Sequence, residues 1–204
     1  MPQIQGLYAV TPDSDHPEVL LSQVAAVLAG GARVLQYRDK INGNDVRLRV
    51  ARQLRELCDA SGATFIINDD VPLALACNAD GVHVGKDDLA LEQARDALPG
   101  KIIGVSCYNQ LQRARDMAAR GADYVAFGRF FPSKTKPNAA QAEVELLQQA
   151  SVELGVPLVA IGGITLDNAP QLIAAGANSL AVINDLFTAA DIEARARAYA
   201  QLWP

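Results

Sequence analysis

Histidine is scarce in this 204-residue sequence, which contains only His16 and His83. His16 falls in an early loop and His83 inside an apolar segment, where a structural role is the simpler interpretation. No Ser-His-Asp or Cys-His arrangement suggests itself, which argues against acyl transfer. A Schiff-base enzyme needs a lysine in apolar surroundings, whereas Lys40, Lys86 and Lys136 stand among charged or loop residues.

Cysteine and positive charge are scarce as well. The cysteines Cys58, Cys77 and Cys107 are odd in number and lack metal-ligand spacing, so we expect reduced, buried thiols and a cytoplasmic setting. The formal net charge of −5 argues against a nucleic acid or a membrane surface as partner. No apolar run approaches a membrane span, and no basic-then-apolar leader precedes Gly6. We therefore expect one soluble domain over residues 1–204.

A short sequence motif recurs along the chain: small residues, usually including Gly or Ala, are followed by a short apolar run. The glycine is typical of a helix C-cap, and the run after it is too short and too β-branched to be another helix. The copies read AGGARVLQY, ASGATFIIN, NADGVHVG, RGADYVAFG and AGANSLAVI. Together with apolar runs at Gly6–Val10, Lys101–Ser106 and Pro157–Ile161, they predict about eight strands.

Helical patterns separate these strands, for example at Glu18–Ala29, Asp45–Ala60 and Leu111–Arg120. Continuous apolar strands are typical of a parallel sheet that is covered by helices. Eight such repeats in this length predict an α/β fold, a single (β/α)8 TIM barrel with parallel strands. The alternative is an open doubly wound sheet, but no Gly-x-Gly-x-x-Gly follows the first strand.

In such a barrel the chemistry lies at the carboxyl ends of the strands. Two neighbouring strands in FIINDDVPLALACNADGVHVGKDD end in acidic clusters, at Asn68–Asp70 and at Gly85–Asp88. Parallel strands would bring both clusters to one edge, where they suit a shared Mg²⁺. The alternative is that these aspartates are only helix caps and turn residues.

Cations and hydroxyls follow other predicted strands. Arg38 and Lys40 end the second, and the long connection Phe130–Gln141 after the sixth reads FFPSKTKPNAAQ, a candidate lid. Its hydroxyls alternate with ammonium groups, as phosphate oxygens require. We expect one phosphate on main-chain amides near Gly163 and Asn184, and a more highly charged group on metal, Arg38, Lys40 and Lys136. These cations, the metal and the amides are suited to neutralise the charge on a departing diphosphate.

These residues belong to a set of motifs that run in order through the chain: QYRDK, IINDD, GVHVGKDD, GVSCYN, GRFFPSKTKP, AIGGIT and AVIN. In this order and spacing the chain resembles the thiamine-phosphate synthase, or thiamine-phosphate pyrophosphorylase, family. The resemblance implies a transferase that couples 4-amino-5-hydroxymethyl-2-methylpyrimidine diphosphate to a thiazole phosphate and releases diphosphate. It further implies Mg²⁺ and a dissociative step, in which the diphosphate leaves before the thiazole nitrogen attacks.

The resemblance also assigns residues to ligands. For the pyrimidine diphosphate it implies Gln36, Tyr37, Arg38, Asp39, Lys40, Asn68, Ser106 and Lys136. For Mg²⁺ it implies Asp69 and Asp88. For the thiazole phosphate it implies Ser133, Lys134, Thr135, Gly163, Ile183 and Asn184. The residues expected to act in catalysis are Arg38, Lys40, Ser106 and Lys136.

Four positions depart from the usual family pattern. This chain has Lys86 where the family usually has Gln, Tyr108 where it has His, Arg129 where it has Pro and Asn184 where Ser is frequent. Two rival functions remain, a thiazole tautomerase-like isomerase and a non-catalytic binder of thiamine intermediates. Retention of metal carboxylates with several cations argues against both. The sequence leaves a homo-oligomer open, because barrel helices present similar mixed surfaces to solvent or to a partner.

Overall fold

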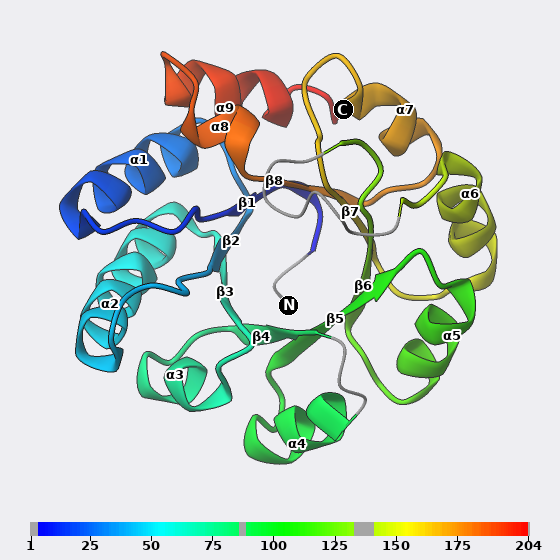
Figure 1. Cartoon of the computed structure of the whole chain (residues 1–204), viewed down its shortest axis with the longest axis horizontal. Helices are drawn as coiled ribbons and strands as arrows, with labels where there is room; N and C mark the ends of the chain where they lie inside the picture. Colours follow the sequence, from blue (N-terminus) through cyan, green and yellow to red (C-terminus); the bar gives the residue numbers. More distant parts are fainter. Residues whose placement is uncertain (1–3, 86–88, 133–140, 204) are drawn as a thin grey trace.

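A computed structural model describes residues 4–85, 89–132 and 141–203. Its strands form one closed, all-parallel barrel in chain order, from β1 to β8 (Figure 1). The strands are β1 Gly6–Val10, β2 Val34–Tyr37, β3 Thr64–Asn68, β4 Gly81–Val84, β5 Ile102–Tyr108, β6 Tyr124–Phe127, β7 Leu158–Ile161 and β8 Ser179–Val182. The predicted TIM barrel is confirmed. The open sheet is ruled out because β1 pairs with β8 as well as with β2.

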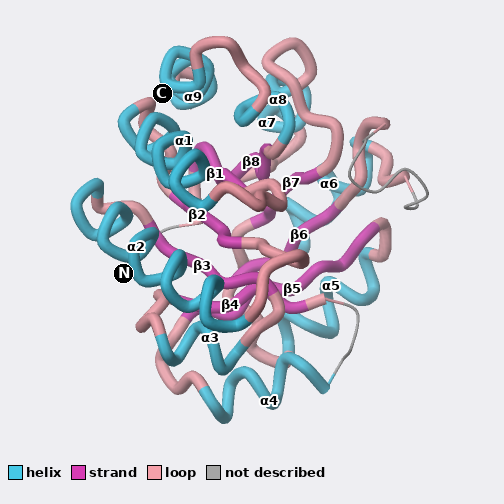
Figure 2. The backbone as a smooth tube through the Cα atoms, turned by 60° about the vertical axis from the view of Figure 1, so that its left-hand side comes forward, coloured by secondary structure: helices cyan, strands magenta, loops and turns pink. Residues whose placement is uncertain are grey.

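Helices surround the barrel, and Figure 2 shows them outside the strands from a second direction. They are α1 Pro17–Ala29, α2 Asn44–Ser61, α3 Val71–Ala76, α4 Leu89–Ala97, α5 Leu111–Ala119, α6 Val144–Glu153, α7 Ala169–Ala174, α8 Asn184–Phe187 and α9 Ile192–Ala200. The predicted helix ranges agree to within a residue at each end. In the described ranges no helix is both long and apolar enough to cross a membrane.

Strand alternation divides the buried side chains into two sets. One set packs between strands and helices, and includes all three cysteines as free, buried thiols. Burial raises the pKa of the Cys58 thiol to about 12, so this thiol stays protonated and unreactive. The other set fills the barrel interior: Ile4, Tyr8, Val10, Val34, Ile66, Tyr124, Ala126, Val159 and Ala181. This inner set lies directly beneath the carboxyl ends of the strands and supports the residues of the site.

The recurring sequence motif has a structural role at the amino ends of the strands. The residue just before β4, β6 and β8 carries a side-chain acceptor for a main-chain N–H of the preceding strand. The pairs are Asp80 with Phe65 (2.7 Å), Asp123 with Ile103 (2.7 Å) and Asn178 with Leu158 (2.8 Å). Arg55 and Arg95 add ion pairs to the two aspartates. These polar groups therefore stabilise strand pairing at the end opposite the predicted chemistry.

Candidate active site

A cavity of about 720 Å³ opens at the carboxyl ends of the strands. Residues from all eight strands or the turns after them line it. The predicted site residues among them are Gln36, Arg38, Asn68, Ser106, Gly163, Ile183 and Asn184. Tyr108 and Arg129, two of the departures from the family pattern, also line it. The barrel thus gathers residues far apart in the sequence, as expected for this fold.

Part of the predicted site lies outside the described residues. This holds for Lys86, Asp88, Ser133, Lys134, Thr135 and Lys136, and for most of the candidate lid. Their assignments stay predictions.

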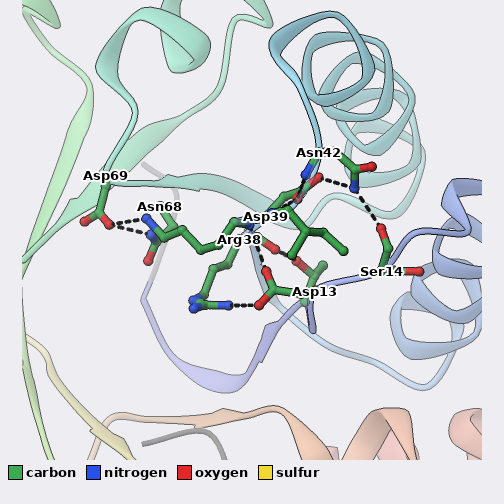
Figure 3. A network of polar contacts seen from close by, with 10 residues as sticks. Asp13, Ser14, Arg38, Asp39, Asn42, Asn68 and Asp69 are labelled. Atoms are coloured by element: carbon green, nitrogen blue, oxygen red, sulfur yellow. Dashed lines mark hydrogen bonds and ion pairs between the residues drawn. The ribbon is translucent and has the colours of Figure 1, made fainter.

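The predicted cations Arg38 and Lys40 are held by two carboxylates. Nη1 of Arg38 lies 2.8 Å from Oδ2 of Asp13 (Figure 3). The other oxygen of Asp13 accepts the main-chain N–H of Lys40 at 2.8 Å. Nζ of Lys40 lies 2.8 Å from Oδ2 of Asp69. Asp13, in the connection after β1, therefore orders the Arg38–Lys40 segment, a role that the sequence analysis missed.

The two aspartates after β3 have different environments. Asp70 caps α3 by accepting from Leu73 N at 2.9 Å and pairs with Arg47, so the helix-cap interpretation is right for this residue. Asp69 instead adopts a left-handed conformation, with φ of 60°, and its carboxylate is half-exposed. Its Oδ2 accepts from Nδ2 of Asn68 at 2.8 Å as well as from Lys40 (Figure 3).

Asp69 is chemically suited to bind a hard cation, because its carboxylate is accessible to solvent and already pairs with the positive charge of Lys40. Within the described ranges no group of three or more His, Cys, Asp or Glu side chains surrounds a common point. Mg²⁺ takes one or two protein carboxylates and leaves its other positions to water and phosphate. Asp69 offers one such carboxylate, and the assignment of Mg²⁺ to Asp69 and Asp88 stays a prediction.

Tyr37 and Asp39 support the loop after β2. The hydroxyl of Tyr37 donates to Oδ2 of Asp39 at 2.8 Å. Asn42 donates to the same oxygen at 2.9 Å (Figure 3). Burial alone would raise the pKa of Asp39, but hydrogen bonds from Asn42, Ile41 and Tyr37 outweigh it and hold the pKa below its usual value. Neither side chain lines the cavity. Their contact with substrate stays a prediction.

The glycines after β7 allow two connections to meet. Gly162 and Gly163 have φ of 103° and 66°. A Cβ at Gly163 would lie 2.4 Å from the carbonyl oxygen of Pro132, so only glycine lets the chain after β6 pass here. Phe131 N donates to Gly162 O at 3.0 Å. The turn thus fixes the start of the candidate lid, while the predicted approach of a ligand to Gly163 is untested.

The end of β8 is held by α9. Asn184 begins α8 directly after Ile183, and both line the cavity. The next residue, Asp185, is paired with Arg195 at 3.0 Å and accepts from the hydroxyl of Tyr199 at 2.7 Å. The negative charge of Asp185 is thereby balanced beside the predicted monophosphate site.

His83 lies inside the apolar strand β4, as predicted, but its contact with the cavity was not predicted. The imidazole is buried but also lines the cavity, and its Nε2 lies 2.8 Å from Oγ of Ser106. Its Nδ1 lies 2.9 Å from the hydroxyl of Tyr124. Val82 and Val84 pack outward against the helices, so alternation along β4 directs His83 inward. That alternation was the signal available in the sequence.

A second cavity, of about 800 Å³, lies at the amino ends of the strands. Its carboxylates, Asp80 and Asp123, already accept hydrogen bonds from main-chain N–H groups and from arginines. These acids therefore serve strand pairing.

The fold and the first cavity together define a class of protein: a (β/α)8-barrel enzyme with cations and carboxylates at one edge of its cavity and glycine turns at another. A family model described as thiamine monophosphate synthase matches residues 7–186. The chain belongs to this thiamine monophosphate synthase family. It is a transferase of thiamine biosynthesis that acts on small molecules, as the motifs implied.

Similar proteins support the assignment over the full length. The thiamine-phosphate synthase of Methylobacillus flagellatus is 56% identical over 204 residues, covering 100% of this chain and 97% of that protein. That of Aromatoleum aromaticum is 54% identical, covering 98% and 97%. Among solved structures, a thiamine phosphate pyrophosphorylase from Pyrococcus furiosus has a TM-score of 0.88 at 31% identity, covering 97% of this chain and 95% of that one.

Proposed function

We propose that the chain condenses 4-amino-5-hydroxymethyl-2-methylpyrimidine diphosphate with a thiazole phosphate, giving thiamine phosphate and diphosphate. The observation that carries the proposal is the distribution of charge around one cavity. Arg38 lines it at β2, with the Lys40–Asp69 pair beside it, whereas the Gly162–Gly163 turn and Asn184 line it at β7 and β8. The first group suits a diphosphate, and the second suits a monophosphate bound by main-chain amides.

In this proposal Arg38 stays paired with Asp13 through Nη1 and offers its other guanidinium N–H groups to oxygens of the leaving diphosphate. Lys40 exchanges Asp69 for oxygens of the same group. Ser106 and Lys136 would contact the same group. Asp69 and Asp88 would hold Mg²⁺, which when bound neutralises charge on the diphosphate. Because charge develops on the leaving oxygens, the ordering of Arg38 and of the Lys40 main chain by Asp13 reduces the reorganisation that the reaction requires.

The proposed reaction needs no general base, because the thiazole nitrogen that attacks carries no proton. The aminopyrimidine stabilises a cation at its methylene group, so the diphosphate can leave first. The protein then has to hold the two reactants together and exclude water. Apolar side chains in the cavity wall, Val10, Ala126 and Ala181, support that role.

We also propose that residues 1–204 act as one cytoplasmic catalytic domain with no nucleic-acid or membrane partner. Pairing of β1 with β8 supports the single domain, since closure of the barrel needs both ends of the chain. The net charge of −5 supports the absence of polyanionic partners.

The proposal is tested by incubating the purified protein with both phosphorylated precursors, with and without Mg²⁺. We expect diphosphate and thiamine phosphate to appear in equal amounts, only when both precursors and Mg²⁺ are present. Diphosphate release without thiamine phosphate would indicate hydrolysis instead. Absence of both products from folded protein would contradict the proposal.

A further inference from the structure

A buried chain of hydrogen bonds crosses the barrel beneath the cavity. It runs from Gln36 on β2 through Tyr8 on β1 and Tyr124 on β6 to His83 on β4, and ends at Ser106 on β5. The successive contacts measure 2.8, 2.8, 2.9 and 2.8 Å. Both ends and His83 line the cavity, whereas Tyr8 and Tyr124 lie below it at 1% and 0% exposure. The two tyrosines therefore touch the groups that face substrate without lining the cavity themselves.

We propose that Tyr8 and Tyr124 are positioning residues that hold His83 as its Nε2–H tautomer and so direct the hydroxyl proton of Ser106 into the cavity. The inference rests on the proposed function, in which Ser106 contacts the pyrimidine diphosphate. It concerns how the protein prepares that contact before any substrate binds.

Which group donates in each of these hydrogen bonds follows from counting the protons along the series from Gln36 to Ser106. Nε2 of Gln36 donates to the hydroxyl of Tyr8. Each phenol has one proton, and a buried O–H needs an acceptor. Tyr8 therefore donates to its other partner, Tyr124, and Tyr124 donates to Nδ1 of His83. A neutral imidazole that accepts at Nδ1 carries its proton at Nε2, which donates to Oγ of Ser106. Ser106 accepts this bond, so its own proton is left for a partner in the cavity.

Both phenols keep their protons, as this count requires. Burial raises the pKa of Tyr8 and of Tyr124 far above the ordinary value for tyrosine. For Tyr124 the neighbouring Tyr8 raises the pKa further.

The opposite direction is the physical alternative. If the Gln36 amide were turned over, its oxygen would accept from Tyr8, and every proton in the chain would reverse. His83 would then be protonated at Nδ1, and Ser106 would donate to Nε2. Only lone pairs of Ser106 would face the cavity, and these repel phosphate oxygens, which are acceptors as well. Anion binding therefore favours the first direction, and the two directions differ in one measurable property, the tautomer of His83.

The fold makes room for this chain. Gly104 on β5 lies directly opposite Tyr124 in the strand register. A Cβ at Gly104 would lie 1.9 Å from Cζ of Tyr124. The tyrosine ring thus fills space that any other residue at position 104 would occupy, and its hydroxyl is held at the centre of the barrel.

The decisive measurement is ¹⁵N NMR of the histidine rings in the whole, substrate-free protein, at a pH where His83 is neutral. The sequence has only two histidines, so a His16→Gln variant assigns the remaining signals to His83. We expect a protonated Nε2 and an unprotonated Nδ1. A protonated Nδ1 in the wild-type protein would overturn the proposal.

Tyr124→Phe removes the donor to Nδ1, and we expect the tautomers of His83 to become mixed. Tyr199→Phe is the matched control, because it removes another buried tyrosine hydroxyl, bonded to Asp185, and should leave the tautomer unchanged. Tyr8→Phe provides a second test if Tyr124→Phe does not fold, and the wild-type spectrum decides the tautomer in either case. An unchanged tautomer in a folded Tyr124→Phe protein would contradict the role of Tyr124.

Kinetics distinguish positioning from mere structural support. We expect Tyr124→Phe to lower kcat/KM for the pyrimidine diphosphate about tenfold, as for loss of one hydrogen bond. Combined with Ser106→Ala, it should add nothing further, because Tyr124 acts through Ser106. Additive effects would contradict this route. If the two precursors together give no turnover but the Nε2–H tautomer still depends on Tyr124, the proposed function is wrong. The role of Tyr8 and Tyr124 in setting the His83 tautomer is then still supported.

Discussion

Nζ of Lys40 lies 2.8 Å from Oδ2 of Asp69, so a cation from the loop after β2 neutralises a carboxylate at the end of β3. Both side chains are half-exposed. A divalent ion bound to Asp69 would compete with the ammonium for the charge of this carboxylate. In the proposed function, a metal at Asp69 and a diphosphate at Lys40 therefore favour each other, since each takes one partner from the present ion pair.

Lys40→Met should have opposite effects on the two ligands. Without the competing ammonium, we expect Mn²⁺ to bind the substrate-free protein about two- to fivefold more tightly, as loss of an exposed ion pair allows. Turnover should fall about 10- to 100-fold, because a cation for the diphosphate is lost. Electron paramagnetic resonance of Mn²⁺ and a steady-state assay measure the two effects. Lys101→Met, whose lysine bonds Asn78 at the opposite end, should change neither. Weaker Mn²⁺ binding in Lys40→Met would contradict the competition.

Asp13→Ala should impair binding of the pyrimidine diphosphate, although Asp13 acts only through Arg38 and Lys40 and does not itself contact the substrate. Asp13 orders Arg38 through its side chain and residue 40 through its main chain. We expect kcat/KM for the pyrimidine diphosphate to fall about tenfold, with the KM for the thiazole phosphate unchanged. Asp15→Ala, at an exposed position in the same loop, is the control. Equal losses for both substrates would indicate a general disturbance of the fold instead.

Asp123→Ala should destabilise the protein and spare its activity. The carboxylate accepts from Ile103 N and pairs with Arg95 at the amino ends of the strands. Loss of this acceptor leaves the N–H of the buried Ile103 without its carboxylate partner, which should lower the free energy of unfolding by about 1–3 kcal/mol in urea titration. Asp116→Ala, on the exposed face of α5, should cost little. A strong loss of kcat in folded Asp123→Ala protein would show that the two ends of the barrel are coupled.

Asp39 should make stability depend on pH. Its folded pKa lies below the ordinary value of 3.8, so its contribution is complete above about pH 4 and is lost as the pH falls through the folded pKa. Asp39→Asn should reduce the free energy of unfolding by about 1–3 kcal/mol at neutral pH, and the difference from wild type should shrink in acid. Urea titrations at a series of pH values measure this, with the exposed Asp15→Asn as control. A difference that does not change with pH would refute the carboxylate's role.

Much of the fold followed from local patterns. The recurring motif at five of the strands combines a helix C-cap with a run of apolar residues, and both signals depend only on near neighbours in the chain. The predicted boundaries for α1, α2 and α5 agree to within a residue, because their caps and apolar faces are also local. The cations after β2 and the glycines after β7 could be assigned to one end of the barrel, since parallel strands have all their carboxyl ends there.

The sequence by itself thus determined the barrel, its polar end and the residue types gathered there. Only the tertiary structure decided how these residues divide their tasks. Asp69 and Asp70 are adjacent and chemically identical, yet Asp70 caps α3 whereas Asp69 pairs with Lys40 from the loop after β2. His83 stands in an apolar strand, yet closure of the barrel brings it between Tyr124 and Ser106. Such pairings join residues distant in the chain, and they exist only once the barrel has closed and fixed which face of each strand points inward.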